Sequence, residues 1–257
     1  MPLGEIMSDD IGHILSSWPY HSDEDINVRM ITGRDGTRKI QMRIDMGIIQ
    51  MEIDGHPAGT VVEGFESWLE YYKHEQETYD KRKVDDFFTL NSDDFQKLRH
   101  EGVQYYYRYL SLMKLEDYKR VVRDTERNLR LFSFVKKHAS TEMDRWALDQ
   151  FRPYVIMMNT RAKATISLRD STKTGIEKAL RYCNEGIDAI LDFYREYDLA
   201  AEIENSLELS ILKALKSEFV REKPQSLEDK LQAAIREERF EDAAVLRDMI
   251  RTEQQKQ

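Results

Sequence analysis

The residues of this sequence with the most chemical potential are its histidines and carboxylates, because these side chains bind metals and transfer protons. The six histidines are scattered along the chain. His74-Glu75 begins like the H-E-x-x-H motif of zinc peptidases, but Thr78 stands where the second histidine belongs. Glu70 lies one helical turn before His74, and a surface hydrogen bond suits that pair better than a shared metal. We therefore predict no metal site and no cofactor.

A catalytic nucleophile is equally hard to find. The chain has no G-x-S-x-G motif, and its only cysteine, Cys183, lies in an apolar helical row that is typical of a core. The run Tyr105-Tyr106-Tyr107-Arg108-Tyr109 has side chains that stack on bases or anchor an interface. Neighbours on a helix point in different directions, so we expect Tyr106 and Tyr109 to pack in the core. The sequence predicts a protein that is not an enzyme.

Composition narrows the class of protein further. The 257 residues give room for one large or two small domains, and 40% of them are hydrophobic. The net charge of −9, with acidic and basic residues interleaved, provides no electrostatic footprint for nucleic acid. No stretch is apolar enough to span a membrane, and residues 1–10 do not follow the plan of a secretory signal. With a single cysteine, these features lead us to expect a cytoplasmic protein.

The elements that position any site begin with residues 1–60, where we predict a short helix and a three-stranded antiparallel β-meander. Residues 8–18 carry apolar side chains at helical spacing. Apolar and polar residues then alternate with a two-residue period around Val28 and Met30, from Lys39 to Met46, and from Ile49 to Asp54. The first turn is expected at residues 33–36, and Gly47 interrupts the second pair of strands.

Residues 61–222 are predicted to form a scaffold of helical hairpins, so the fold class is mainly α. Asn91-Ser92-Asp93-Asp94 is typical of a helix start, and residues 114–117 of a turn between two long helices. A third long helix opens at Ser140-Thr141, and Pro153 is expected to kink or break it. The segments 107–135 and 161–190 resemble tetratricopeptide-type hairpins in plan, although their spacing exceeds the thirty-four residues of that repeat. An ordinary helical bundle explains them equally well.

The last segment, residues 226–255, is predicted to be a short helical hairpin. Ser226 is a suitable N-cap, with Asp229 as an acidic partner three residues later. Apolar residues recur at helical spacing on both sides of a break at residues 237–240. Ala243 and Ala244 are small enough to let two helices approach closely, and Phe240 is expected to plug the turn end of the hairpin.

This hairpin resembles the UVR motif, which occurs in the excision-repair proteins UvrB and UvrC and in the bacterial stress proteins McsA and ClpC. The resemblance is dense and ungapped over about an eighth of the chain. It implies a protein–protein contact, often between two such hairpins. The partner-binding residues that it implies are Leu231, Ala234, Ile235, Phe240, Glu241, Ala243, Ala244, Leu246, Arg247, Asp248 and Ile250.

Other features of those proteins are missing from this sequence. UvrB needs a G-x-x-x-x-G-K-[ST] phosphate loop, whereas the glycine-containing stretch at residues 33–39 lacks the Lys-Ser/Thr ending and fits a hairpin turn. McsA needs Cys-x-x-Cys pairs for zinc, which a single cysteine rules out. The resemblance therefore implies docking, and it does not extend to helicase, nuclease or kinase-activator activity.

We accordingly expect a non-catalytic adaptor that docks a protein partner through its UVR hairpin, in excision repair or in Clp-linked protein quality control. The partner is either another UVR-containing protein or a second copy of this chain. A nucleic-acid-associated repair accessory protein is the alternative. The acidic balance argues against it, so we expect no direct contact with nucleic acid and none with membranes.

Overall fold

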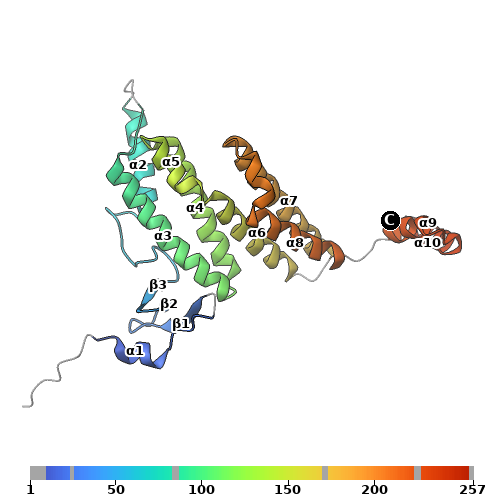
Figure 1. Ribbon diagram of the computed structural model, residues 1–257, viewed down its shortest axis with the longest axis horizontal. Helices are drawn as coiled ribbons and strands as arrows, with labels where there is room; N and C mark the ends of the chain where they lie inside the picture. The colour runs from blue at the N-terminus through green and yellow to red at the C-terminus, as the bar shows by residue number, and fades with distance from the viewer. Residues whose placement is uncertain (1–9, 24–25, 83–86, 170–172, 223–226, 255–257) are drawn as a thin grey trace, which may run out of the picture.

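The computed structural model describes residues 10–23, 26–82, 87–169, 173–222 and 227–254 (Figure 1). The chain begins with the short helix α1 (Gly12–Ser17) and continues into three strands, β1 (Asn27–Thr32), β2 (Arg38–Ile44) and β3 (Gly47–Glu52). The strands form an antiparallel sheet in the order β1-β2-β3, and helices follow. The predicted fold class, a mainly α chain with an N-terminal meander and a C-terminal hairpin, is confirmed.

The two faces of the sheet follow the alternation in the sequence. Ile40, Met42 and Met51 lie on the inner face and are buried in the main hydrophobic core. The outer face carries a ladder of cross-strand polar contacts, in which Gln41 accepts a hydrogen bond from Arg29 and donates one to Gln50. These contacts fix the register, because a slip of one residue would exchange the two faces.

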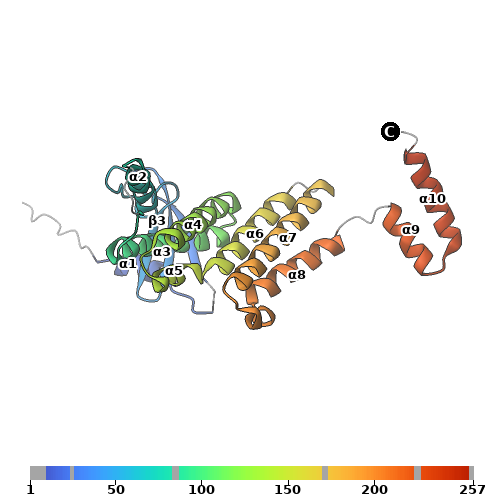
Figure 2. The ribbon, with the colours of Figure 1, turned by 90° about the horizontal axis from the view of Figure 1, so that it is seen from above.

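The helical part of the chain continues along the molecule from the sheet (Figure 2). Its elements are α2 (Trp68–Lys81), α3 (Ser92–Lys114), α4 (Tyr118–His138), α5 (Glu142–Asp149), α6 (Arg152–Leu168), α7 (Lys173–Glu196), a 3₁₀ helix (Ala200–Asn205) and α8 (Leu207–Glu222). Helix α4 packs between α3 and α6, and α7 packs between α6 and α8. The tetratricopeptide likeness of segments 107–135 and 161–190 stays a prediction.

The predicted signals explain where several helices begin. Asn91 accepts hydrogen bonds from the backbone N–H groups of Asp93 and Asp94, and the Asp94 side chain accepts one from the Asn91 backbone. This is a complete capping box at the start of α3. Pro153 breaks the third long helix into α5 and α6, because a proline is tolerated in the first turn of a helix but not in its interior.

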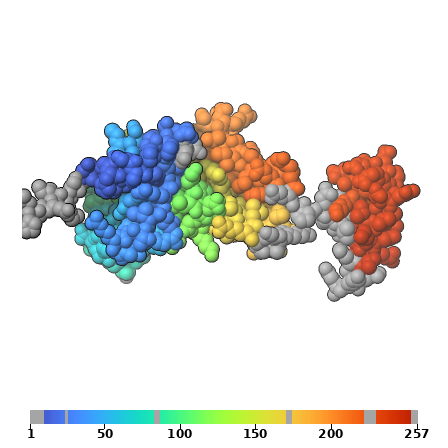
Figure 3. Space-filling view, turned by 90° about the horizontal axis from the view of Figure 1, so that it is seen from below, coloured from blue at the N-terminus to red at the C-terminus, as the bar shows by residue number. Residues whose placement is uncertain are grey.

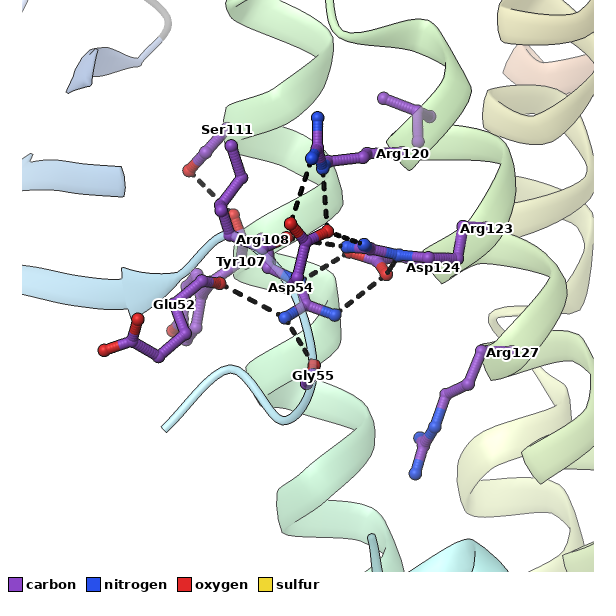
Figure 4. Close-up of polar contacts among 12 residues, drawn as sticks. Glu52, Asp54, Gly55, Tyr107, Arg108, Ser111, Arg120, Arg123, Asp124 and Arg127 are labelled. Atoms are coloured by element: carbon purple, nitrogen blue, oxygen red, sulfur yellow. Dashed lines mark hydrogen bonds and ion pairs between the residues drawn. The ribbon is translucent and has the colours of Figure 1, made fainter. Parts of the chain in front are cut away.

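Buried ion pairs join the sheet to the helices (Figure 4). Arg108 on α3 is bidentate to Asp124 on α4, with Nε–Oδ2 and Nη2–Oδ1 distances of 2.6 and 2.9 Å, and both side chains are buried. Arg108 Nη1 also donates to the carbonyl oxygen of Gly55 at 2.7 Å. A single guanidinium therefore connects α3, α4 and the segment that follows β3.

A second, exposed set of ion pairs surrounds Asp54. Its carboxylate accepts hydrogen bonds from Arg120 at 2.9 Å and contacts Arg123, which also donates to Asp124 at 2.8 Å. The hydrogen bond from Arg120 is the largest cause that lowers the pKa of Asp54 to about 2. Exposed pairs of this kind contribute little to stability, so the buried Arg108–Asp124 pair is the stronger link.

Candidate functional site

The C-terminal hairpin consists of α9 (Leu227–Arg236) and α10 (Phe240–Gln254), joined by a three-residue turn. The N–H of Glu238 donates to the carbonyl of Ile235, and the N–H of Arg239 to that of Ala234. This is the Schellman pattern that ends a helix. Glu238 takes the left-handed position with a φ of 57°, where glycine is more usual. The predicted cap residues Ser226 and Asp229 lie outside the described residues and side chains.

The seam between the two helices contains small side chains. Ala234 on α9 is fully buried and Ala243 on α10 is 8% exposed. Leu231, Leu246 and Ile250 are half-buried along the same seam. The alanines allow the close approach that the sequence predicted, and the larger side chains extend the contact away from the turn.

Several apolar side chains of the hairpin are exposed. Ile235, Phe240, Val245 and Met249 are 45%, 67%, 61% and 51% exposed, and Ala244 is also exposed. The prediction that Phe240 plugs the turn end is wrong, because it stands at the start of α10 and the buried positions beside the turn belong to Ala234 and Ala243. Val245 and Met249 are not among the contact residues that the UVR resemblance implies. Helical spacing from the buried Ala243 nevertheless places both side chains outside the seam, where a partner can reach them.

Helical spacing assigns these side chains to two flanks of α10. Phe240 and Ala244 lie four residues apart on one flank, and Val245 and Met249 on the other. Val245 borders a shallow groove of about 380 Å³ between α9 and α10, opposite Ala233. Either flank therefore offers an apolar surface to a partner.

Charged residues surround both flanks. Glu241, Arg247 and Asp248 are exposed, and Arg247 lies 3.7 Å from its neighbour Asp248. Arg239, the last residue of the turn, pairs with Asp242 in the first turn of α10 at 2.6 Å. This mixture of both signs resembles the polar rim that surrounds the apolar centre of protein interfaces.

The hairpin is separate from the rest of the described chain (Figure 3). Neither hydrophobic core cluster of the described residues includes a hairpin side chain. Helices α9 and α10 pack on each other and share no extensive contact with another described element. Units of fewer than about 40 residues rarely fold stably on their own core. A hairpin with two buried alanines therefore gains stability when another surface covers it.

Comparison with known proteins agrees with this geometry. The family described as the UvrB/uvrC motif (UVR) matches residues 225–255, at the C-terminus as predicted. No curated protein and no solved structure matches the chain. The family match covers the hairpin and does not extend to the sheet or the helical scaffold.

The buried Glu101 and Arg127 side chains link α2, α3 and α4. The Glu101 carboxylate accepts hydrogen bonds from the N–H groups of Trp68 and Leu69 at 2.6 and 3.2 Å, so it caps α2 from α3. It also forms an ion pair with Arg127, whose pKa burial lowers to about 9, which leaves the guanidinium charged at neutral pH. The sequence carried no local signal for this cap, because Glu101 lies more than thirty residues from the helix it caps.

Glu70 and His74, the pair weighed for a shared metal, have other partners. Glu70 pairs with Lys73 at 3.0 Å, and the His74 ring packs against Phe65 at 5.2 Å, so the expected hydrogen bond between Glu70 and His74 is not formed. Within the described residues no group of three histidine, cysteine or acidic side chains is arranged to hold a metal. Cys183 is buried as predicted. No helix in the described part of the chain is long and apolar enough to cross a membrane.

His56 lies beside the Glu101 cap and is held in its neutral form. Its Nδ1 accepts a hydrogen bond from the Ala58 N–H, which requires Nδ1 to be unprotonated. Its Nε2 therefore carries the proton and lies 3.4 Å from Glu101 Oε2. Burial, followed by the charges of Arg127 and Arg108, lowers the pKa of His56, and burial also lowers the pKa of His138.

The lowered pKa values of His56 and His138 predict that the stability of the fold depends on pH. An unfolded histidine has a pKa of about 6.5, and the folded values lie below it. The unfolded chain therefore binds more protons as the pH falls through this window, and the free energy of unfolding decreases. We expect urea midpoints to be constant above about pH 7 and to fall towards pH 5. His138→Asn should flatten this slope in part, and an unchanged midpoint down to pH 5 would contradict the assignment.

Proposed function

We propose that this protein is a non-catalytic adaptor that binds a protein partner through its C-terminal UVR hairpin. The observation that carries the proposal is a small hairpin that matches the UVR motif and leaves apolar side chains exposed outside both hydrophobic cores. Cores of protein interfaces are rich in such apolar side chains, with polar groups at the rim. The helical scaffold would then carry the hairpin to a second component.

The UVR family suggests a class of partner and does not identify one protein. UVR motifs suggest another UVR-containing protein or a second copy of this chain, in excision repair or in Clp-linked protein quality control. The mixed charges on the hairpin favour an oriented protein contact, since a single-sign surface would be needed to attract nucleic acid at physiological salt.

Point variants of the hairpin test the proposal more sharply than its removal. Ala244→Glu and Val245→Glu each place one new charge on one apolar flank of α10, and Gln232→Glu places the same charge at an exposed polar position of α9. We expect the flank variant that faces the partner to weaken binding at least about tenfold, because an unpaired charge in an interface costs more than 1.4 kcal/mol. Gln232→Glu should bind normally.

The measurement is quantitative affinity purification from the native host, with the full chain, the three variants and a chain that ends at Glu222. Proteins retained by the full chain and by Gln232→Glu, but lost with one flank variant and with the shortened chain, are the hairpin's partners. Analytical ultracentrifugation of the purified chain separates self-association from binding of a different protein. Identical partner lists and the same oligomeric state for all five proteins would overturn the proposal.

A further inference from the structure

A hollow of about 530 Å³ lies on the helical scaffold. One wall comes from α3, the floor from α4, and the opposite wall from the junction of α5 and α6. Pockets that enclose small ligands span about 300–1,000 Å³. The size of this hollow is therefore that of a small-molecule site.

The lining of the hollow is mostly aromatic. Phe132 on the floor and Tyr109 on the α3 wall are buried, with 4% and 1% exposure, while Tyr106 and Tyr154 line the walls half-buried. Tyr109 is buried in the main core as expected, and Tyr106 packs half-buried against that core. The angle between neighbours on α3 turns the buried Tyr105 towards α4 and Arg127 and leaves Tyr106 at the hollow.

The phenol of Tyr154 lies in the wall of the hollow beside the ring of Tyr106, and burial raises its pKa to about 12. At the rim, Val103 and Phe151 expose 41% and 54% of their surface. A ligand with a planar apolar body would cover these side chains, and aromatic rings gain about 0.5–1.5 kcal/mol in such pairs beyond the burial of area.

Two charged residues border the hollow, and they differ in the contacts that their side chains make. Glu208 of α8 already accepts a hydrogen bond from the Ser206 hydroxyl at 3.1 Å. Arg99 of α3 is exposed and forms no ion pair with any residue in the described ranges. Glu208 keeps its negative charge beside the hollow, and the exposed guanidinium of Arg99 is the group there that pairs with a carboxylate.

We propose that this hollow binds a small aromatic carboxylate, with its ring between the tyrosine and phenylalanine side chains and its carboxylate against Arg99. Apolar walls supply the affinity and the guanidinium selects for charge. The hollow shares no residue with the hairpin, so this site does not depend on the proposed adaptor function. It gives the scaffold a ligand of its own.

Three probes separate the ring from the charge. Indole-3-propionate carries both, indole-3-propionamide keeps the ring without the charge, and 3-cyclohexylpropionate keeps the charge without the aromatic ring. Binding to the full-length protein is measured by saturation-transfer NMR and calorimetry. We expect indole-3-propionate to bind most tightly, and equal affinities for the acid and the amide would overturn the role of Arg99.

Matched variants locate the site. Arg99→Gln should weaken indole-3-propionate about two- to fivefold, the scale of an exposed ion pair, and Glu208→Gln should strengthen it by a similar factor, because a like charge is removed. Both should leave the amide unchanged. Arg34→Gln, the same change in the exposed β1–β2 turn, should alter nothing. Val103→Trp should fill the hollow and abolish binding of all three probes.

Two outcomes would refute the site. Unchanged binding to Val103→Trp would show that the probes bind elsewhere. If circular dichroism shows that Val103→Trp does not fold, the site is tested with Arg99→Gln and Glu208→Gln. These two variants alter exposed or half-buried side chains. Equal effects of Arg99→Gln and Arg34→Gln would then reduce the interaction to long-range attraction and overturn the proposal.

Discussion

Asp124→Ala is expected to lower the free energy of unfolding by about 3–5 kcal/mol, because it leaves the Arg108 guanidinium buried without its carboxylate. Such a loss is a large part of the roughly 5–15 kcal/mol that stabilises a typical domain. The backbone carbonyls of Gly55 and Glu52, at 2.7 and 3.2 Å, are the remaining hydrogen-bond partners of Arg108. We therefore expect the segment after β3 to lose its anchor to α3 together with the ion pair. Urea unfolding followed by circular dichroism measures the change.

The control for this prediction lies next to the buried pair. Asp54→Ala also removes a carboxylate from two arginines, but this carboxylate is 57% exposed, so the expected loss is at most about 1 kcal/mol. If Asp124→Ala prevents folding, Asp124→Asn removes the charge and keeps an acceptor oxygen for Arg108. Equal losses for the Asp54 and Asp124 variants would show that burial does not strengthen this network.

Much of the fold could be predicted because its signals are local. The strands around Ile40 and Met51 follow a two-residue period, and the start of α3 follows from the cap residues Asn91 and Asp94. The turn of the C-terminal hairpin lacks the glycine that usually marks a helix end, since Glu238 takes its place. The hairpin was nevertheless predictable, because its apolar spacing changes phase across the turn.

The missed features depend on contacts between distant segments. Nothing near Trp68 indicates that Glu101 caps α2, since that contact exists only after α2 and α3 pack. The exposure of Phe240 depends on how closely α9 approaches α10, which the sequence pattern does not determine. The aromatic hollow likewise arises where α3, α4 and the α5–α6 junction meet, so spacing alone could not show that Tyr106 lines it.

Gly186→Ala is the second change with a large expected effect. Gly186 lies in α7 against α6, where an added Cβ would lie 2.2 Å from Thr160 Oγ1 and 2.9 Å from Thr160 Cγ2. Thr160 is buried and has little room to move. Overpacking of this kind costs about 1–3 kcal/mol, which outweighs the gain of up to about 1 kcal/mol from replacing a helical glycine. Urea midpoints at constant slope measure the loss.

Two further variants distinguish this clash from a general intolerance of alanine. At Gly102 in α3 an added Cβ meets only the flexible end of Leu131, at 3.4 Å, so Gly102→Ala should be neutral or stabilising by up to about 1 kcal/mol. Thr160→Ala removes the two atoms nearest to the new Cβ at position 186. The double variant should therefore lose less free energy of unfolding than the two single variants lose together, with a coupling of about 0.5–3 kcal/mol. If the two losses simply add, α6 and α7 separate to admit the methyl group. In that case the close packing of these two helices is not the reason for glycine at position 186.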